Sequence, residues 1–182
     1  MLSAERKAQI EAKTNEVIER YNLQEPNFDL AHFLSTQEGF LLGEQDMDNN
    51  TTGILLVNKA EKLPRFGTNQ LISTNARLRY SPDYKARRRF IVAHEYAHYQ
   101  LHMEGETIFA HRDYTHKNDP MEEEADFFAR CLLMPRQLVE VLLRTLPQST
   151  SLDEKAKRIA STFGVTEKKA TQRLTEDLKE VA

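Results

Sequence analysis

The five residues His94-Glu95-Tyr96-Ala97-His98 combine the residue types and the spacing of a catalytic metal site on a helix. Four residues advance an α-helix by about 400°, so the two histidines project from one face, one turn apart. Two imidazole nitrogens at that separation can both reach one tetrahedral Zn²⁺ at about 2.0–2.1 Å. Glu95 lies one position round the helix, where its carboxylate can bind the water on the metal rather than the metal. There it would act as the general base of peptide hydrolysis.

The residues around this pentapeptide favour a metal site over a histidine pair held by core hydrogen bonds. Residues 85–103 contain neither Gly nor Pro, and their apolar positions recur at helical spacing. These positions are Phe90, Ile91, Ala93, Ala97 and Leu101. Histidines bracketed by core residues are not explained as solvated surface, so the pattern predicts a buried site on a helix.

A catalytic zinc ion needs a third protein ligand, because water occupies its fourth position. Residues 121–134, which end before Pro135, form a second helical pattern. Glu122 lies close to Ala125 and Ala129 on that helix, and small alanines permit another helix to approach. The spacing therefore predicts Glu122 as the third ligand.

The other acidic residues of this second helix have different expected roles. Asp126 lies one turn after Glu122, on the same face, where it would accept the outer N–H of a zinc-bound histidine and fix its tautomer. Glu123 is a weaker competitor for the metal, and Glu124 points away from the apolar stripe. A solvated first turn, favoured by the helix dipole, explains both.

Together the two motifs resemble the ImmA/IrrE family of zinc metallopeptidases. Its members carry an HExxH helix and, further along, the signature E-x-E-A-(D/N)-x-F-A-x-x-L-L-M-P, which residues 122–135 match. The resemblance implies a zincin-like core with His94, His98 and Glu122 as ligands of one Zn²⁺ and Glu95 as the catalytic base. It also implies a substrate, a helix-turn-helix transcriptional repressor whose cleavage relieves repression of mobile-element or stress genes.

Other potential ligands fit the pattern less well. A metzincin site would need a glycine and a third histidine where this chain has Leu101 and Glu104. His102 continues the histidine row but lies another turn along, so it is expected beside the site or at the helix end, where a cation suits the dipole. Cys131 lies on nearly the opposite side of the second helix from Glu122 and is expected to be a buried small hydrophobe.

The segments before the zinc helix predict an α+β fold with a small three-stranded sheet packed on that helix. An amphipathic helix is expected over residues 3–21 and a short second helix over residues 29–37. Three short apolar or β-prone runs, residues 40–42, 53–57 and 69–74, predict an antiparallel or mixed sheet. A strand at the sheet edge can bind a substrate backbone by strand addition. Residues 71–75 are the candidate for that edge, and an ordinary paired strand is the alternative.

Residues 105–119, between the two zinc helices, form a polar stretch without periodicity, which predicts a loop over the cleft. His111, Tyr114 and His116 in this loop are open candidates for donating a hydrogen bond to the oxyanion. No spacing rule selects among them, and a plain surface role is the alternative.

The chain is expected to divide into a zincin-like metallopeptidase domain, residues 1–147, and a C-terminal segment, residues 148–182, packed on it. Two helical patterns, residues 152–163 and 167–178, flank a Gly164-Val165-Thr166 turn and resemble a helix-turn-helix. From residue 153 onward the segment has seven basic and six acidic residues, a balance that is poor for neutralising phosphates. The pattern favours a packing or partner-docking role over direct DNA binding.

Composition gives no case for a membrane or a nucleic-acid partner. The formal net charge is −3, and no apolar run approaches the length of about 18 residues that a membrane span needs. The N-terminal residues lack the apolar stretch of a signal peptide, and the single cysteine cannot form an internal disulfide. A cytoplasmic protein is therefore expected. The basic cluster at residues 85–89 is expected to be a solvated face, with contact to an acidic partner or substrate as the alternative.

The sequence supports three hypotheses about function. The leading one is a cytoplasmic zinc endopeptidase. The alternative is a regulatory binding protein that keeps the fold and the metal but sequesters a repressor without cleaving it. The presence of Glu95 argues against this alternative, because a binding protein does not need a residue that is not a ligand. The third is a direct DNA-binding regulator that uses residues 148–182, and the oligomeric state is open under all three.

Overall fold

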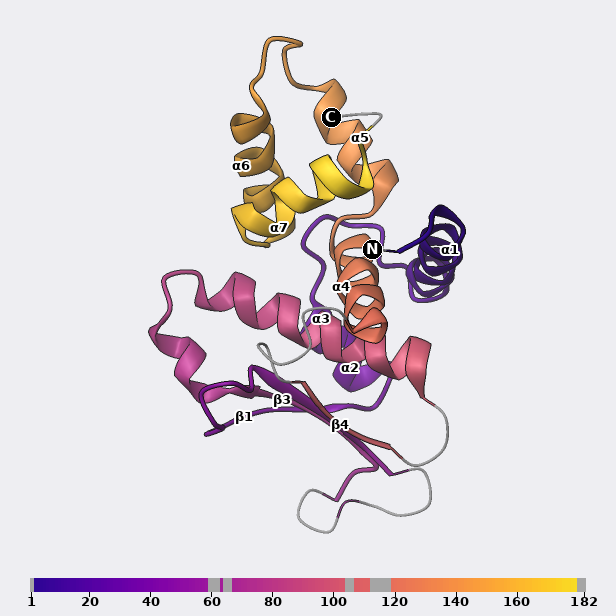
Figure 1. Cartoon of the computed structure of the whole chain (residues 1–182), viewed down its shortest axis with the longest axis vertical. Coiled ribbons are helices and arrows are strands. Elements are labelled where there is room, and N and C mark those ends of the chain that lie inside the picture. Colours follow the sequence, from indigo (N-terminus) through magenta and orange to yellow (C-terminus); the bar gives the residue numbers. More distant parts are fainter. Residues whose placement is uncertain (1, 59–62, 64–66, 104–106, 112–118, 180–182) are drawn as a thin grey trace.

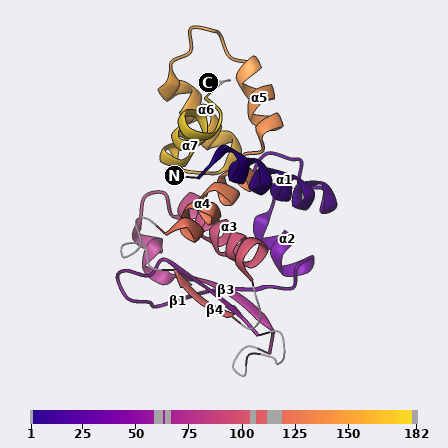
Figure 2. The same ribbon diagram turned by 45° about the vertical axis from the view of Figure 1, so that its right-hand side comes forward.

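The chain folds into helices layered on a small sheet in the computed structural model, which describes residues 2–58, 63, 67–103, 107–111 and 119–179. Helix α3, Tyr84–His102, lies across one face of the sheet (Figure 1). Helix α4, Pro120–Leu133, packs on the side of α3 that faces away from the sheet, as Figure 2 also shows. The predicted α+β class is confirmed. Within the described residues, no helix has the length and apolarity to cross a membrane.

Two helices precede the sheet, and a polar side chain caps each one. Helix α1, Ala4–Arg20, begins after Ser3, whose Oγ accepts a hydrogen bond from the Arg6 amide at 3.1 Å. Helix α2, Leu30–Thr36, is capped in the same way by Asp29. Such caps satisfy N–H groups that have no partner inside the helix. Helix α1 packs against α4, so an element from the start of the chain borders the second site helix.

The sheet is mixed and has one strand more than the sequence predicts. Its strands are β1 Leu41–Gln45, β2 Gly53–Val57, β3 Gln70–Asn75 and β4 Thr107–His111. In the order β1-β3-β2-β4, β1 runs parallel to β3, while β2 runs antiparallel to both β3 and β4. The three predicted strands are confirmed. Because β3 lies between β1 and β2, the prediction of an edge strand at residues 71–75 is wrong and the paired-strand alternative is correct.

The fourth strand, β4, lies in the segment that the sequence predicts to be a loop. Its five residues stand among polar neighbours and are too few to give a periodic signal. The strand forms through its ladder with β2, in which Leu55 pairs with Phe109. A ladder of this kind satisfies backbone groups that a loop would leave to water. The neighbouring strand, rather than the local sequence, therefore specifies β4.

The two helices that carry the candidate site meet through small residues. Ala93 and Ala97 of α3 and Ala125 and Ala129 of α4 are fully buried. Side chains of this size let the two helix backbones approach closely, as the alanine pattern predicts. Asp119 caps α4 by accepting a hydrogen bond from the backbone at 2.9 Å, and a proline occupies the first turn, where its missing N–H has no helical partner.

The C-terminal segment is helical, as the sequence predicts. Its elements are α6 Leu152–Phe163, α7 Glu167–Gln172 and the π-helical turn η2 Arg173–Asp177, and helix α5, Arg136–Arg144, precedes them. Gly164 ends α6 with a φ of 65°, and a Cβ at this position would lie 2.3 Å from Asn27 Oδ1. Only glycine fits both constraints. Thr166 then caps α7 by accepting a hydrogen bond from the Lys169 amide.

The basic cluster at residues 85–89 is a solvated face only in part. Arg88 forms an ion pair with Glu44 of β1, with 2.8 Å between Nε and Oε1. Arg89 donates a hydrogen bond from Nη1 to the Phe28 carbonyl at 2.7 Å. These two arginines tie α3 to the sheet and to the segment before α2, and the other basic side chains of the cluster are exposed.

Candidate metal centre

Three side chains from α3 and α4 meet at one point, and they are the three predicted ligands. His94 and His98 approach each other with 3.1 Å between their Nε2 atoms. Glu122 places Oε2 at 3.1 Å from His94 Nε2 and Oε1 at 3.4 Å from His98 Nε2. One ligand atom from each residue lies within 4.8 Å of the other two. Both imidazoles are buried, whereas the side chain of Glu122 keeps some exposure.

Asp126 holds the outer nitrogen of His94, where the sequence predicts it. Its Oδ1 lies 3.0 Å from His94 Nδ1. Burial alone would raise the pKa of Asp126, but the hydrogen bond with His94 and the charge of Lys169 keep that pKa below its usual range. Asp126 is therefore an ionised acceptor, and His94 donates from Nδ1. The Nε2 lone pair of His94 then points into the cluster.

A longer series of hydrogen-bonded side chains holds the outer nitrogen of His98. Its Nδ1 lies 3.0 Å from Nδ1 of His102, and Nε2 of His102 lies 3.0 Å from Glu124 Oε2. Arg6 of α1 donates hydrogen bonds to both carboxylate oxygens of Glu124, from Nε at 2.7 Å and from Nη2 at 2.5 Å. The hydrogen bond from Arg6 lowers the pKa of Glu124, burial opposes this shift, and the bond to His102 adds to it.

The donors and acceptors in this hydrogen-bonded series can be assigned by starting from Glu124. The carboxylate of Glu124 can only accept, so His102 donates to it from Nε2, and the tautomer with its proton on Nε2 accepts at Nδ1. His98 must then donate from Nδ1, which leaves its Nε2 as an acceptor. Burial lowers the pKa of His98, which favours the neutral ring that metal ligation requires.

Two imidazole nitrogens and a carboxylate oxygen therefore converge on one point. With His94 and His98 protonated on Nδ1, a cation between these acceptor atoms would offset their mutual repulsion. The donor set, two histidines and one carboxylate with their outer N–H groups held by other residues, is the one that catalytic zinc uses. The residues present fit a Zn²⁺ ion.

Glu95, the predicted general base, lies on the sheet side of α3 and is fully buried. A Cβ placed on Gly53, the first residue of β2, would lie 2.7 Å from Glu95 Oε1 and 2.5 Å from Ile91 Cγ2. The carboxylate therefore packs directly against the backbone of β2. A glycine in a strand often marks such a close approach, and this signal was available in the sequence.

A cleft of about 900 Å³ opens beside His94 and Asp126. The N-terminal half of α3, with Arg87 and Phe90, forms one wall, and the α6–α7 pair, with Lys157 and Lys169, forms the other. Thr52, which precedes β2, also lines it. The C-terminal helices thus border the same cleft as His94, one of the three metal-ligand candidates.

The structure brings together every predicted ligand, and it also uses residues that the sequence did not single out. The sequence predicts a solvated first turn for Glu124, yet its side chain lies between His102 and Arg6. His102 lies beside the site, which is one of its two predicted places, and Cys131 is buried as predicted.

The three candidates for oxyanion stabilisation cannot be ranked from the described residues. His111 ends β4, where its backbone pairs opposite Gly53. The placement of its side chain, and of Tyr114 and His116 as a whole, lies outside what the structure describes.

Comparison with known families gives one match. A family model described as the IrrE N-terminal-like domain, Peptidase M78, matches residues 49–175. The matched range contains α3, α4, the sheet from β2 onward and the helices α6 and α7. A search of curated proteins gave no match.

Proposed function

Because the chain belongs to the IrrE N-terminal-like family of M78 peptidases, whose model matches well over half of it, we propose that the protein is a zinc-dependent endopeptidase. One observation carries the proposal. The two imidazoles of His94 and His98 and the carboxylate of Glu122 each place a possible ligand atom within 4.8 Å of the others. This is a donor set for a metal cation, and the fourth coordination position of such a site binds water or substrate.

Glu95 carries the proton transfers in this proposal. A bound Zn²⁺ would supply a Lewis acid that polarises a peptide carbonyl and acidifies water. Glu95 accepts a proton from the attacking water at a carboxylate oxygen. It then delivers that proton to the leaving amine nitrogen as the C–N bond breaks. Asp126 keeps the proton of His94 on Nδ1 throughout, so the imidazole retains its orientation.

The proposed substrate is a helix-turn-helix transcriptional repressor, cleaved to relieve repression of mobile-element or stress genes. The resemblance of residues 94–98 and 122–135 to ImmA/IrrE peptidases supports this substrate class. The cleft of about 900 Å³ beside His94 can accept a segment of a protein substrate. We propose that the C-terminal helices form a wall of this cleft and do not bind DNA. Ala170 of α7 and Arg173, which follows it, are fully buried, so these side chains pack within the protein.

The test compares wild type with Glu95→Gln and with the control Glu123→Gln, which makes the same change at an exposed residue of α4. Each protein is loaded with zinc and incubated with the candidate repressor, and cleavage is followed by mass spectrometry. We expect Glu95→Gln to lower kcat about 10²–10⁴-fold, as loss of a general base does, while zinc content and repressor binding stay unchanged. Full cleavage by Glu95→Gln would contradict the mechanism. Binding of the repressor by all three proteins without cleavage would favour the sequestering protein instead.

A further inference from the structure

Lys169 of α7 reaches the metal centre from the C-terminal segment. Its Nζ lies 2.7 Å from Asp126 Oδ2, and the other oxygen of the same carboxylate lies 3.0 Å from His94 Nδ1. One carboxylate therefore joins an ammonium group to the predicted ligand histidine. The Lys169 side chain is 19% exposed, so water screens this ion pair less than it screens a surface pair.

An aromatic ring holds the same ammonium group from the other site helix. Lys169 Nζ lies 4.0 Å from the centroid of the Phe90 ring on α3. A cation over an aromatic face is attracted by the ring quadrupole. Lys169 thus contacts both helices of the metal centre, and its position depends on where α7 lies against them.

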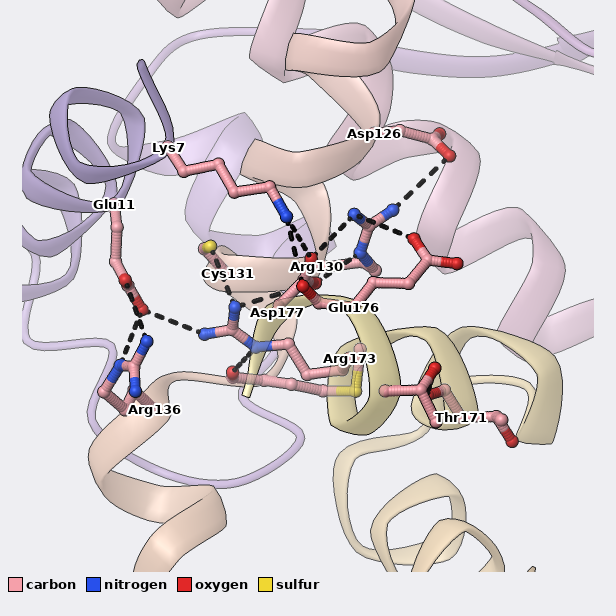
Figure 3. Close-up of polar contacts among 12 residues, drawn as sticks. Lys7, Glu11, Asp126, Arg130, Cys131, Arg136, Thr171, Arg173, Glu176 and Asp177 are labelled. Atoms are coloured by element: carbon pink, nitrogen blue, oxygen red, sulfur yellow. Dashed lines mark hydrogen bonds and ion pairs between the residues drawn. The ribbon is translucent and has the colours of Figure 1, made fainter. Parts of the chain in front are cut away.

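A buried charge network fixes that position. Figure 3 shows Arg130 of α4 binding both carboxylate oxygens of Asp177 in η2, at 2.6 and 3.1 Å. The side chain of Asp177 is fully buried. Arg173, which is also fully buried, donates to the Met134 carbonyl at 3.1 Å and to Glu11 of α1 at 3.2 Å. Fixed ion pairs of this kind hold η2, and with it α7, against α4.

Arg130 does not replace Lys169 at Asp126. Its Nη1 lies 3.7 Å from Asp126 Oδ2, whereas its Nε and Nη2 are engaged by Asp177. Without Lys169, the nearest described cation on Oδ2 would be this more distant guanidinium. The carboxylate would then lose its shortest contact with a cation and be less firmly oriented towards His94.

We propose that Lys169 is a positioning residue of the metal centre, acting through Asp126 to orient His94, and that the C-terminal helices are therefore part of the metal site rather than an appended unit. The inference rests on the proposed function only in taking zinc as the ion. It gives α7 a role in positioning the metal centre, and this role does not require DNA binding.

The test measures the zinc dissociation constant of the full chain by competition with a chromophoric chelator. Lys169→Met removes the charge and keeps most of the stem, Lys169→Arg keeps a cation, and Lys168→Met is the matched control at an exposed neighbour. We expect Lys169→Met to weaken zinc binding about 10–100-fold, the usual effect of losing a residue that orients a ligand. Lys169→Arg should recover most of the affinity, and Lys168→Met should match wild type. Wild-type affinity in Lys169→Met would overturn the inference and leave the peptidase proposal standing.

A double-mutant cycle separates positioning from a general loss of stability. If Lys169 acts through Asp126, adding Lys169→Met to Asp126→Asn should weaken zinc binding no further. Equal losses in the wild-type and Asp126→Asn backgrounds would show that Lys169 acts by another route and would refute the inference. A wild-type chain that binds no zinc would overturn both this inference and the proposed function.

Discussion

Gly53→Ala tests whether the position of Glu95 depends on the backbone of β2. The new methyl group would lie 2.7 Å from Glu95 Oε1 and 2.5 Å from Ile91 Cγ2. An ordinary van der Waals contact begins at 3.4 Å, so both groups must move by several tenths of an ångström. Glu95 lies on the helix that also carries His94 and His98, but its carboxylate can rotate away without moving the imidazoles.

Misplacing a catalytic group lowers the rate of the chemical step without necessarily weakening substrate binding. Displacement of about 1 Å costs on the order of 10²-fold in rate, so we expect kcat of Gly53→Ala to fall about 10–100-fold while KM changes little. Zinc affinity should remain that of wild type. Overpacking at this contact should also lower the free energy of unfolding by about 1–3 kcal/mol.

The matched control for this substitution is Gly43→Ala in β1. A Cβ at Gly43 meets Ser73 Oγ at 3.6 Å and Leu71 Cδ1 at 3.8 Å, both ordinary contacts. The assay is steady-state cleavage of the repressor, with zinc content measured on the same samples. Wild-type kcat in Gly53→Ala, or an equal loss in Gly43→Ala, would refute the claim that β2 positions Glu95.

Two further predictions concern the charges behind the metal centre. The pKa of Glu124 is lowered in the folded protein, so its contribution to stability is present above its ordinary pKa of 4.5 and is lost as pH falls through the lowered value. Glu124→Gln should therefore reduce the acid sensitivity of the zinc-free protein in urea unfolding at a series of pH values. Asp177→Asn should lower the free energy of unfolding by about 3–5 kcal/mol, because it leaves Arg130 and Arg173 buried beside a neutral group.

Each of these predictions has a control on a neighbouring exposed residue. Glu123→Gln, one position before Glu124, should leave the pH profile unchanged. Glu176→Gln should leave stability within about 0.5 kcal/mol of wild type, because the side chain of Glu176 is half exposed and lies 4.0 Å from Arg130. An Asp177→Asn protein as stable as the Glu176→Gln protein would show that the buried network does not hold η2.

The metal-ligand candidates were predictable because helical periodicity acts locally. His94 and His98 share a face through a spacing that any helix imposes, and Glu122 shares a face with the alanines that admit α3. The structure places these groups together, within 4.8 Å. The C-terminal helices α6 and α7 were predictable for the same reason, since Gly164 and Thr166 mark the turn between them.

Asp126, the support of His94, was predictable from its place on the second helix, but Arg6 and Lys169 were not, because they come from distant parts of the chain. Arg6 lies 118 positions before Glu124, and Lys169 lies 43 positions after Asp126. A helical wheel correctly turns Glu124 away from the apolar stripe, but it does not show that α1 covers that side. Strand β4 was missed for a similar reason, since its pairing with β2 rather than its own residues defines it.

The most direct test of the metal centre is the zinc content of protein purified without added zinc. Wild type, Glu122→Ala and the control Glu123→Ala are measured by elemental analysis after dialysis. We expect about one zinc per chain in wild type and in the control, and little or none in Glu122→Ala. Wild type that holds no zinc even after zinc is added and dialysed away, or Glu122→Ala that retains it fully, would contradict the His94, His98 and Glu122 site.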